Sequence, residues 1–185
     1  QQTVMAAQAG KHVLCEKPMA LSEENAREMI QACESMGLKL GVGFHLRHHP
    51  GLIEARRIIQ SSTLGTITLV QAQWASGASG VVTPPARTGL EEWWDHPEMV
   101  GAGAMMGTGV HVLDSLRFLL DQEVTEVSAI TDGHTQARPL EHLAAILLRF
   151  DKGTLGAAYY GRRVPYSQND VVVYGSRGRL AVRRC

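Results

Sequence analysis

Two side chains that lie far apart in the sequence, Lys17 and His111, have the chemistry needed for proton transfer. Histidine exchanges a proton near neutral pH, because its reference pKa is about 6.5. His111, Asp114 and Ser115 are spaced i, i+3 and i+4, so they can share one face of a helix. A carboxylate beside an imidazole can fix its tautomer and raise its basicity, which suits a general base. The alternative is a structural histidine, which is common on helices.

Lys17 follows a short apolar run and precedes a proline. Val13–Cys15 is typical of a buried strand of a parallel sheet, and ligands of open α/β sheets gather outside the carboxyl ends of such strands. Lys17 would lie at that end of the sheet, and Pro18 would fix the local backbone dihedral. The alternative is a strand-end lysine that extends its amine to water.

Three segments resemble the Gfo/Idh/MocA oxidoreductases, which are named for glucose-fructose oxidoreductase and inositol dehydrogenase. Residues 10–18 resemble the family's Glu-Lys-Pro segment, and residues 43–47 resemble the stretch where its chain leaves the nucleotide domain. Residues 101–114 resemble its glycine cluster and Gly-x-His-x-x-Asp element. The segments occur in the order that the family requires, and the resemblance runs from about residue 6 to about residue 182.

The resemblance implies hydride transfer between NAD or NADP and a sugar, cyclitol or related polyol, with the cofactor carrying the redox step. It matches Lys17 and His111 to catalytic residues that act on the same small molecule. His111 would take the hydroxyl proton, and Lys17 would orient the alcohol or share the proton. The resemblance also places Glu16, Lys17 and Pro18 near the cofactor, with a cis bond before Pro18 that aims the amine into the cleft. For Glu16, simple solvation at the strand end is the alternative.

Four further residues are candidates for substrate binding. His45 and Arg47 occupy the family's interdomain crossing, where the alternatives are a surface charge or an interdomain contact. Trp94 could stack on a sugar or nicotinamide ring, or it could anchor its loop on the core. Asp114 shares the expected helix face of His111.

One position departs from the resemblance. Family members such as inositol dehydrogenase place an aspartate one helical turn before the histidine, where this chain has Gly107. The departure fits a branch whose reaction relies on Lys17 and His111, or one that has lost hydroxyl-to-carbonyl chemistry. A non-catalytic dimerisation or ligand-binding module derived from the family is therefore the second functional hypothesis.

The elements that would position these residues predict an α+β fold. Residues 1–44 are expected to be the remnant of a parallel α/β Rossmann domain, with a helix that begins after Ser22 as N-cap and stops at Gly37. Residues 45–185 are expected to form an incomplete substrate-binding and dimerisation domain. Its sheet would be open-faced and mainly antiparallel, with helices on one side.

In this second part, apolar residues alternate from residue 65, with residues 67 and 69 on one face and residues 68, 70, 72 and 74 on the other. A helix is expected from Pro50 to about Gln60, and another from about Thr108, which would cap it. The expected buried stripe of that second helix is Val110, Leu113, Leu116 and Leu120. Further strands are expected at residues 124–131, 143–150, 154–160, 171–174 and 180–182.

Two segments between the expected elements lack a regular apolar pattern. Residues 77–97 contain few periodic apolar positions and are expected to form a long excursion from the sheet. The glycines at 101, 103 and 107 do not follow a strand, as a nucleotide-binding loop must. They are expected to permit a close backbone approach instead.

Composition limits the partners. Eighteen basic and eighteen acidic residues give no net charge, so neither nucleic acid nor an anionic membrane is an expected partner. Cys15, Cys33 and Cys185 lack a paired spacing, which favours the reducing cytoplasm over secretion. His45 and its histidine neighbours are not expected to bind metal, because the helix begins after them at Pro50.

Two expectations concern the whole protein. Nothing before Lys11 is long enough to hold a Gly-x-Gly-x-x-Gly turn, so we interpret the chain as a fragment, with a lost leader left open. An exposed sheet face would be covered in a homo-oligomer.

Overall fold

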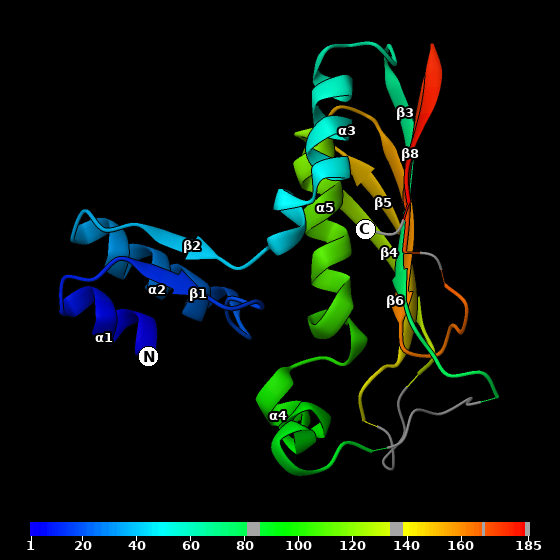
Figure 1. Cartoon of the computed structure of the whole chain (residues 1–185). Helices are drawn as coiled ribbons and strands as arrows, with labels where there is room; N and C mark the ends of the chain where they lie inside the picture. Colours follow the sequence, from blue (N-terminus) through cyan, green and yellow to red (C-terminus); the bar gives the residue numbers. More distant parts are fainter. Residues whose placement is uncertain (81–85, 134–138, 168, 184–185) are drawn as a thin grey trace. The chain divides into compact units, whose positions relative to one another are not determined.

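The structure of the protein is a computed structural model that describes residues 1–80, 86–133, 139–167 and 169–183 (Figure 1). It separates into two compact units, Gln1–Phe44 and His45–Cys185. Cys185 lies outside the described residues, and Cys15 and Cys33 are free thiols. No helix in the described part of the chain has the length and hydropathy to cross a bilayer.

The first unit is a two-stranded parallel sheet with helices. Its elements are α1 (Gln2–Gln8), β1 (Val13–Cys15), α2 (Glu23–Ser35) and β2 (Leu40–Val42). Val13 pairs with Leu40, and Cys15 pairs with Val42. The side chain of Ser22 accepts a hydrogen bond from the backbone amide of Asn25 at 3.2 Å, which confirms the predicted N-cap. The predicted parallel pair of strands is also confirmed.

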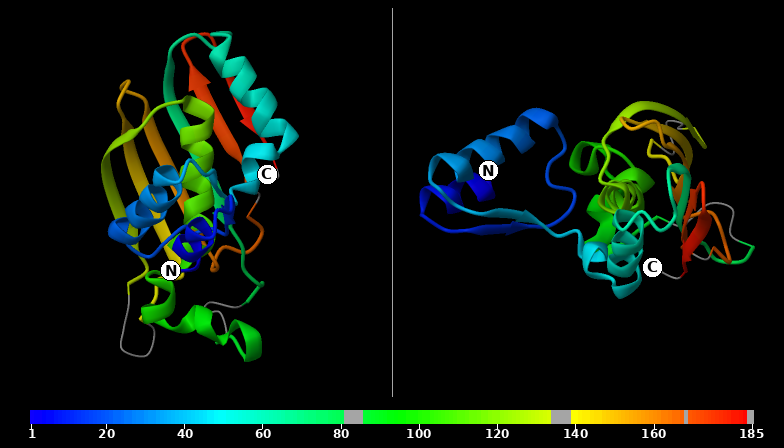
Figure 2. Two further views of the ribbon diagram at one scale, coloured as in Figure 1. Left: turned by 90° about the vertical axis from the view of Figure 1, so that its left-hand side faces the viewer. Right: turned by 90° about the horizontal axis from the view of Figure 1, so that it is seen from above.

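The prediction that β1 is buried on both faces is wrong. Leu14, at its centre, is 80% exposed. Both helices of this unit lie on one side of the strands (Figure 2). Leu14 is the exposed residue between two half-buried neighbours in β1. A strand covered on one face keeps an alternating burial pattern, whatever the hydropathy of its residues.

The second unit contains a six-stranded sheet in the order β4-β5-β6-β3-β7-β8. The neighbouring strands are antiparallel except for β3 and β6, which run parallel, so the expected mainly antiparallel sheet is confirmed. The strands are β3 (Ile67–Ala75), β4 (Val124–Thr131), β5 (Leu143–Phe150), β6 (Leu155–Gly161), β7 (Val171–Gly175) and β8 (Gly178–Val182). The helical elements are η1 (His45–His48), α3 (Pro50–Gln60), η2 (Gly89–Asp95), α4 (Pro97–Val100), the π-helical turn η3 (Met105–Gly109) and α5 (Val110–Leu120).

Helices α3 and α5 cover one face of this sheet (Figure 1). The core lies between them and the strands, where Leu52, Leu116, Leu119, Val70 and Phe150 are fully buried. The expected arrangement, an open sheet with helices on one side, is therefore confirmed. The opposite face carries no described helix (Figure 2).

Three local predictions about the second unit are wrong in detail. Thr108 does not cap α5: its hydroxyl donates to the carbonyl of Ala104 at 3.0 Å, inside the π-helical turn that continues into the helix. Val110 and Leu113 are only half-buried, whereas Val112 and Leu119 are buried. A π-helical turn rotates the faces of the helix that follows it, and a stripe drawn with the α-helical period misses this rotation.

Ile67 packs against the same core as Val70 and Ala72, although the alternation predicts that it shares the opposite face with Leu69. A register shift between Ile67 and Leu69 changes which side of β3 faces inward, because a bulge reverses the alternation. The excursion over residues 77–97 includes η2 and the start of α4, and its residues 81–85 lie outside the described residues.

Replacing Leu116 tests this core. Leu116→Ala is expected to lower the free energy of unfolding by about 2–5 kcal/mol, because it leaves a cavity between α5 and the sheet. The same truncation at Leu90, which is 96% exposed, should change it by less than about 0.5 kcal/mol. Urea unfolding followed by circular dichroism measures both values. Equal losses would contradict the packing described here.

Candidate functional site

Lys17 lies just beyond the end of β1, at a cis peptide bond to Pro18. The cis bond is what the family resemblance implies. Burial lowers the pKa of Lys17, and the neighbouring Glu16 carboxylate partly opposes this by favouring the charged amine. Glu16 also accepts a hydrogen bond from the backbone amide of Lys17, at 3.1 Å. The amine is thus biased toward releasing its proton more readily than an exposed lysine.

The start of the helix that carries His111 is held by Glu141, a residue that the sequence did not single out. The Glu141 carboxylate accepts hydrogen bonds from the backbone amides of Gly103 at 2.7 Å and Met105 at 2.8 Å. Its carbonyl accepts a third from Ala104 at 2.9 Å. These amides have no partner within the helix, and a negative charge there is favourable for the helix dipole. Glu141 gave no local signal, because its partners are 36 and 38 residues away.

Two glycines at the start of this helix allow other residues to come close to its backbone. A Cβ at Gly103 would clash with the carbonyl oxygen of Glu141, and a Cβ at Gly109 would come within 3.0 Å of the Tyr160 ring. The predicted close backbone approach is therefore confirmed at Gly103. At Gly107 a Cβ would meet no atom within 4 Å, so steric exclusion does not explain that glycine.

His111 lies in an aromatic cluster, and only 4% of its surface is exposed. Trp74 of β3 stacks on the imidazole, with ring centroids 4.9 Å apart and an angle of 26°. His45 of η1 meets the same imidazole edge-on, at 4.9 Å and 69°. His45 and Trp74 are also in edge contact at 6.2 Å. Trp74 was assigned only to a strand face, and its place beside His111 depends on the packing of β3 on α5.

Asp114 is held by Arg47. The Arg47 guanidinium donates from Nε to both carboxylate oxygens, at 3.1 and 2.9 Å, and from Nη2 to Oδ1 at 2.6 Å. Hydrogen bonding to Asp114 raises the pKa of Arg47, while partial burial opposes the rise. Asp114 is 5% exposed, so the pair fixes α5 against η1 three residues after His111. The sequence placed both residues at the substrate, and the structure brings them to each other.

Tyr160 also borders this region. Burial, reinforced by the negative charge of Glu141, raises its pKa to about 12. The phenol is therefore a neutral hydroxyl at physiological pH and can serve as a hydrogen-bond donor. The Tyr160 side chain faces the helices because residues alternate along β6 and its even-numbered residues lie on the buried side.

Trp94 lies in a second aromatic cluster, on η2. It stacks on Trp93 with ring centroids 4.4 Å apart, and the Arg87 guanidinium lies 5.6 Å from its ring centroid. Burial tends to raise the pKa of Asp95, but backbone and side-chain hydrogen bonds from Arg87 outweigh it and lower the pKa. These contacts order the segment around Trp94, and its role at a substrate stays a prediction.

Metal ligands do not gather in the described part of the chain, where no group of three or more His, Cys, Asp or Glu residues is placed to hold an ion. His45 faces His111 and Trp74.

Comparison with known proteins gives matches over both units. The sequence model of the GFO/IDH/MocA C-terminal domain matches residues 52–181. The model of an oxidoreductase family with an NAD-binding Rossmann fold matches residues 1–44.

Individual relatives cover nearly the whole chain. A 1,5-anhydro-D-fructose reductase from Ensifer adhaerens is 31% identical over 185 residues, which are 99% of this chain and 53% of the relative. A myo-inositol 2-dehydrogenase from Thermotoga maritima is 26% identical over 182 residues, 96% of this chain and 51% of the relative. The chain spans about half the length of the curated relatives it matches.

A solved structure has the same fold. The crystal structure of an inositol dehydrogenase homolog complexed with NAD+, from Azotobacter vinelandii, superposes with a TM-score of 0.89 at 25% identity. The match covers 98% of this chain and 48% of that one. The expected α+β fold is confirmed by this likeness.

Substituting the glycines before α5 tests the contact with Glu141. Gly103→Ala is expected to lower the free energy of unfolding by at least about 2 kcal/mol, because the new Cβ must displace backbone. Gly107→Ala is the matched control and should be neutral or stabilising by up to about 1 kcal/mol. Thermal and urea unfolding measure both. A Gly103→Ala protein as stable as the control would argue against the close approach.

Proposed function

Because the chain belongs to the Gfo/Idh/MocA family, we propose that it carries the proton-transfer groups of an NAD- or NADP-dependent oxidoreductase acting on a sugar, cyclitol or related polyol. The observation that carries the proposal is the buried imidazole of His111, held between two aromatic rings on the helix that the family match covers. Relatives with names such as 1,5-anhydro-D-fructose reductase and myo-inositol 2-dehydrogenase support the substrate class.

His111 acts as the general base in this proposal. It takes the hydroxyl proton of the substrate during oxidation and returns it during reduction, because imidazole exchanges protons near neutral pH. Trp74 and His45 limit the orientation of the ring. The Arg47–Asp114 ion pair fixes the helix behind it, so that the imidazole keeps one position.

Lys17 is the second proton-handling group, and Glu16, Lys17 and Pro18 form the proposed cofactor contact. The match of residues 1–44 to an NAD-binding Rossmann model supports this assignment. The lowered pKa of Lys17 fits an amine that orients an alcohol or shares its proton. When bound, the nicotinamide supplies the hydride chemistry, and the protein supplies orientation and proton transfer.

His45, Arg47, Trp94 and Asp114 are the proposed substrate-binding residues. His45 supports this by its ring contact with His111, and Arg47 supports it by binding Asp114 on the helix that carries His111. Trp94, which stacks on Trp93, has the kind of aromatic ring on which a sugar ring can pack. The cytoplasm stays the expected location, on the spacing of the cysteines.

Gly107 favours the second candidate function, a non-catalytic dimerisation or ligand-binding module. A glycine has no proton to exchange at the position where family members have an aspartate, although the structure leaves room for a side chain there. Turnover by the protein therefore decides between the two functions.

Substituting the two proton-handling residues tests catalysis. We expect Lys17→Ala and His111→Ala, made in the longest natural open reading frame that contains this chain, to lower kcat/KM on a polyol panel by about 100-fold or more. Reduced nicotinamide should still bind His111→Ala, as measured by cofactor fluorescence. Lys11→Ala and His48→Ala are the controls, because both residues are exposed. Undiminished turnover in both test variants would defeat the assignment, and cofactor binding without turnover in the wild type would support the module.

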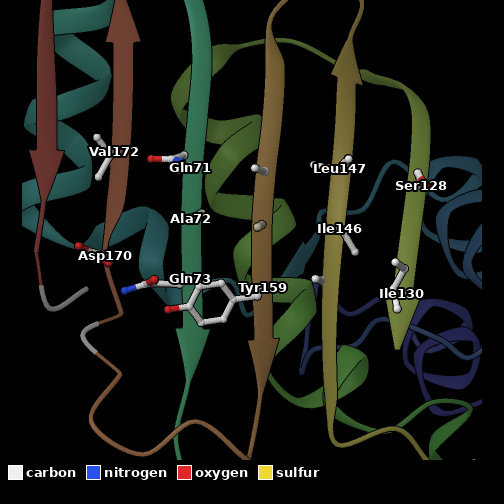
Figure 3. Close-up of a pocket in the computed structure, with 13 residues that line it drawn as sticks. Gln71, Ala72, Gln73, Ser128, Ile130, Ile146, Leu147, Tyr159, Asp170 and Val172 are labelled. Carbon is white, nitrogen blue, oxygen red and sulfur yellow. The ribbon is translucent and has the colours of Figure 1, made fainter. Parts of the chain in front are cut away.

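We further propose that a second copy of the chain covers the open sheet face. Figure 3 shows this face, with Ile130, Leu147 and Tyr159 projecting from β4, β5 and β6 while the helices lie behind the sheet. A shallow hollow of about 520 Å³ lies over it. Ile130 is 78% exposed, and Leu147 and Leu155 are also exposed. An apolar area of this kind on a strand face is typical of an interface, and a two-fold pair would bury the same face twice.

Adding charge to this face tests the oligomer. Leu147→Glu is expected to shift the protein toward monomer in analytical ultracentrifugation, because a dimer would bury an unpaired carboxylate. Leu90→Glu should leave the oligomeric state unchanged, since Leu90 is exposed on η2 and does not lie on the sheet. A monomeric wild type, or a Leu147→Glu dimer, would contradict the proposal.

A further inference from the structure

We infer that His45 carries the proton of His111 to and from solvent, as the outer member of a two-imidazole relay. The inference deepens the proposed function, because it concerns how the base of that reaction is reset after each turnover. It rests on the contact between these two rings and on the difference in their exposure.

His111 has little access to water. Only 4% of its surface is exposed, and the Trp74 indole is stacked on its ring. The indole N–H can donate a hydrogen bond, but its nitrogen cannot accept a proton, so Trp74 cannot carry the proton away from His111. A buried base that accepts a proton in each oxidation needs a group through which that proton leaves.

His45 meets the requirements for that group. Its ring lies edge-on against His111, with centroids 4.9 Å apart, which brings the two rings close enough for one water to carry a proton between their nitrogens. His45 is itself exposed, so its outer edge exchanges with solvent. Both imidazoles can accept a proton on one nitrogen while releasing one from the other.

The proton balance of the relay is simple. In oxidation, the hydride leaves the substrate carbon for the nicotinamide, and the hydroxyl proton passes to His111. His111 releases a proton to His45, and His45 releases one to water or buffer, which returns both rings to their starting state. Reduction runs the same steps backward.

The charged groups on the elements around α5 are engaged with one another. Arg47 of η1 binds Asp114, and Arg117 of α5 binds Glu123. On α3, Arg56 binds Asp121 and Arg57 binds Glu54, while β3 has no ionisable residue. The remaining titratable groups here are His48 of η1, His49 at the N-cap of α3, the Tyr160 phenol, which stays neutral until about pH 12, and Glu141, which is bonded to backbone amides. Among these groups, His45 combines ring contact with His111 and exposure to solvent.

A structural role is the alternative for His45, since an edge-on aromatic contact also stabilises packing. His45→Phe separates the two roles. Phenylalanine keeps an aromatic edge against Trp74 and His111 but has no nitrogen to carry a proton. His48→Phe makes the same change at an exposed histidine of the same 3-10 helix and is the control.

The decisive measurement is the exchange rate of the His111 ring N–H proton with water, followed by nuclear magnetic resonance in the chain with isotope-labelled histidines. We expect His45→Phe to slow this exchange by about tenfold or more, and free imidazole added to the solution to restore it. His48→Phe should leave the rate unchanged. An exchange rate in His45→Phe equal to that of the wild type would overturn the relay, as would a slowed rate that imidazole does not raise.

This measurement needs no turnover, so its failure is distinct from failure of the proposed function, which is judged on the polyol panel. In the enzyme assay, the relay predicts that His45→Phe lowers kcat in weak buffer and recovers with added imidazole. A loss of kcat that is independent of buffer would overturn the relay and leave a positioning role for His45. If His45→Phe fails to fold, His45→Gln serves the same purpose.

Discussion

The buried contact between Glu141 and the backbone that begins the helix of His111 is the constraint on which the candidate site depends. One carboxylate and one carbonyl satisfy three successive amides that have no partner within the helix. Hydrogen bonds to a charged group contribute about 1.5–3 kcal/mol each, and leaving such amides buried and unpaired costs a similar amount. The contact also requires Gly103, because any side chain there would collide with Glu141. The position of the imidazole along the sheet is thereby fixed by a residue that lies just before β5, 30 positions after His111.

The pleat of the sheet supplies the walls around that imidazole. Trp74 and Tyr160 are partners in the parallel pair of β3 and β6, so both project to the side of α5. Gly109 lets the Tyr160 ring approach the helix, and the Trp74 ring stacks on His111, two residues further along. Arg47 then ties the helix to η1 through Asp114, three residues after His111. In contact with the Trp74 and His45 rings, on a helix fixed in this way, the imidazole has little freedom to reorient, which is what proton transfer in a fixed geometry requires.

Much of the fold could be predicted because its signals are local. The Ser22 cap and the proline at the start of α3 depend on residues a few positions apart. The bounds of β4 and β5 followed from hydropathy for the same reason. The start of α5 could not be predicted in this way. Thr108 is a residue type that caps helices, whereas the backbone amides before it are bonded to Glu141. The exposure of Leu14 was also missed, since hydropathy does not say whether a second layer lies above a strand.

For the candidate site, the sequence by itself determined which residues have the chemistry: an amine before a proline, an imidazole and a carboxylate on one helix, and an arginine ahead of α3. It also determined the family, through three short segments in order. Only the tertiary structure decided that Asp114 is bound by Arg47, that Trp74 and His45 contact His111, and that Glu141 holds the helix. The physical reason is that such contacts join residues from 36 to 67 positions apart, and no local pattern of hydropathy or charge specifies which distant partner satisfies a buried group.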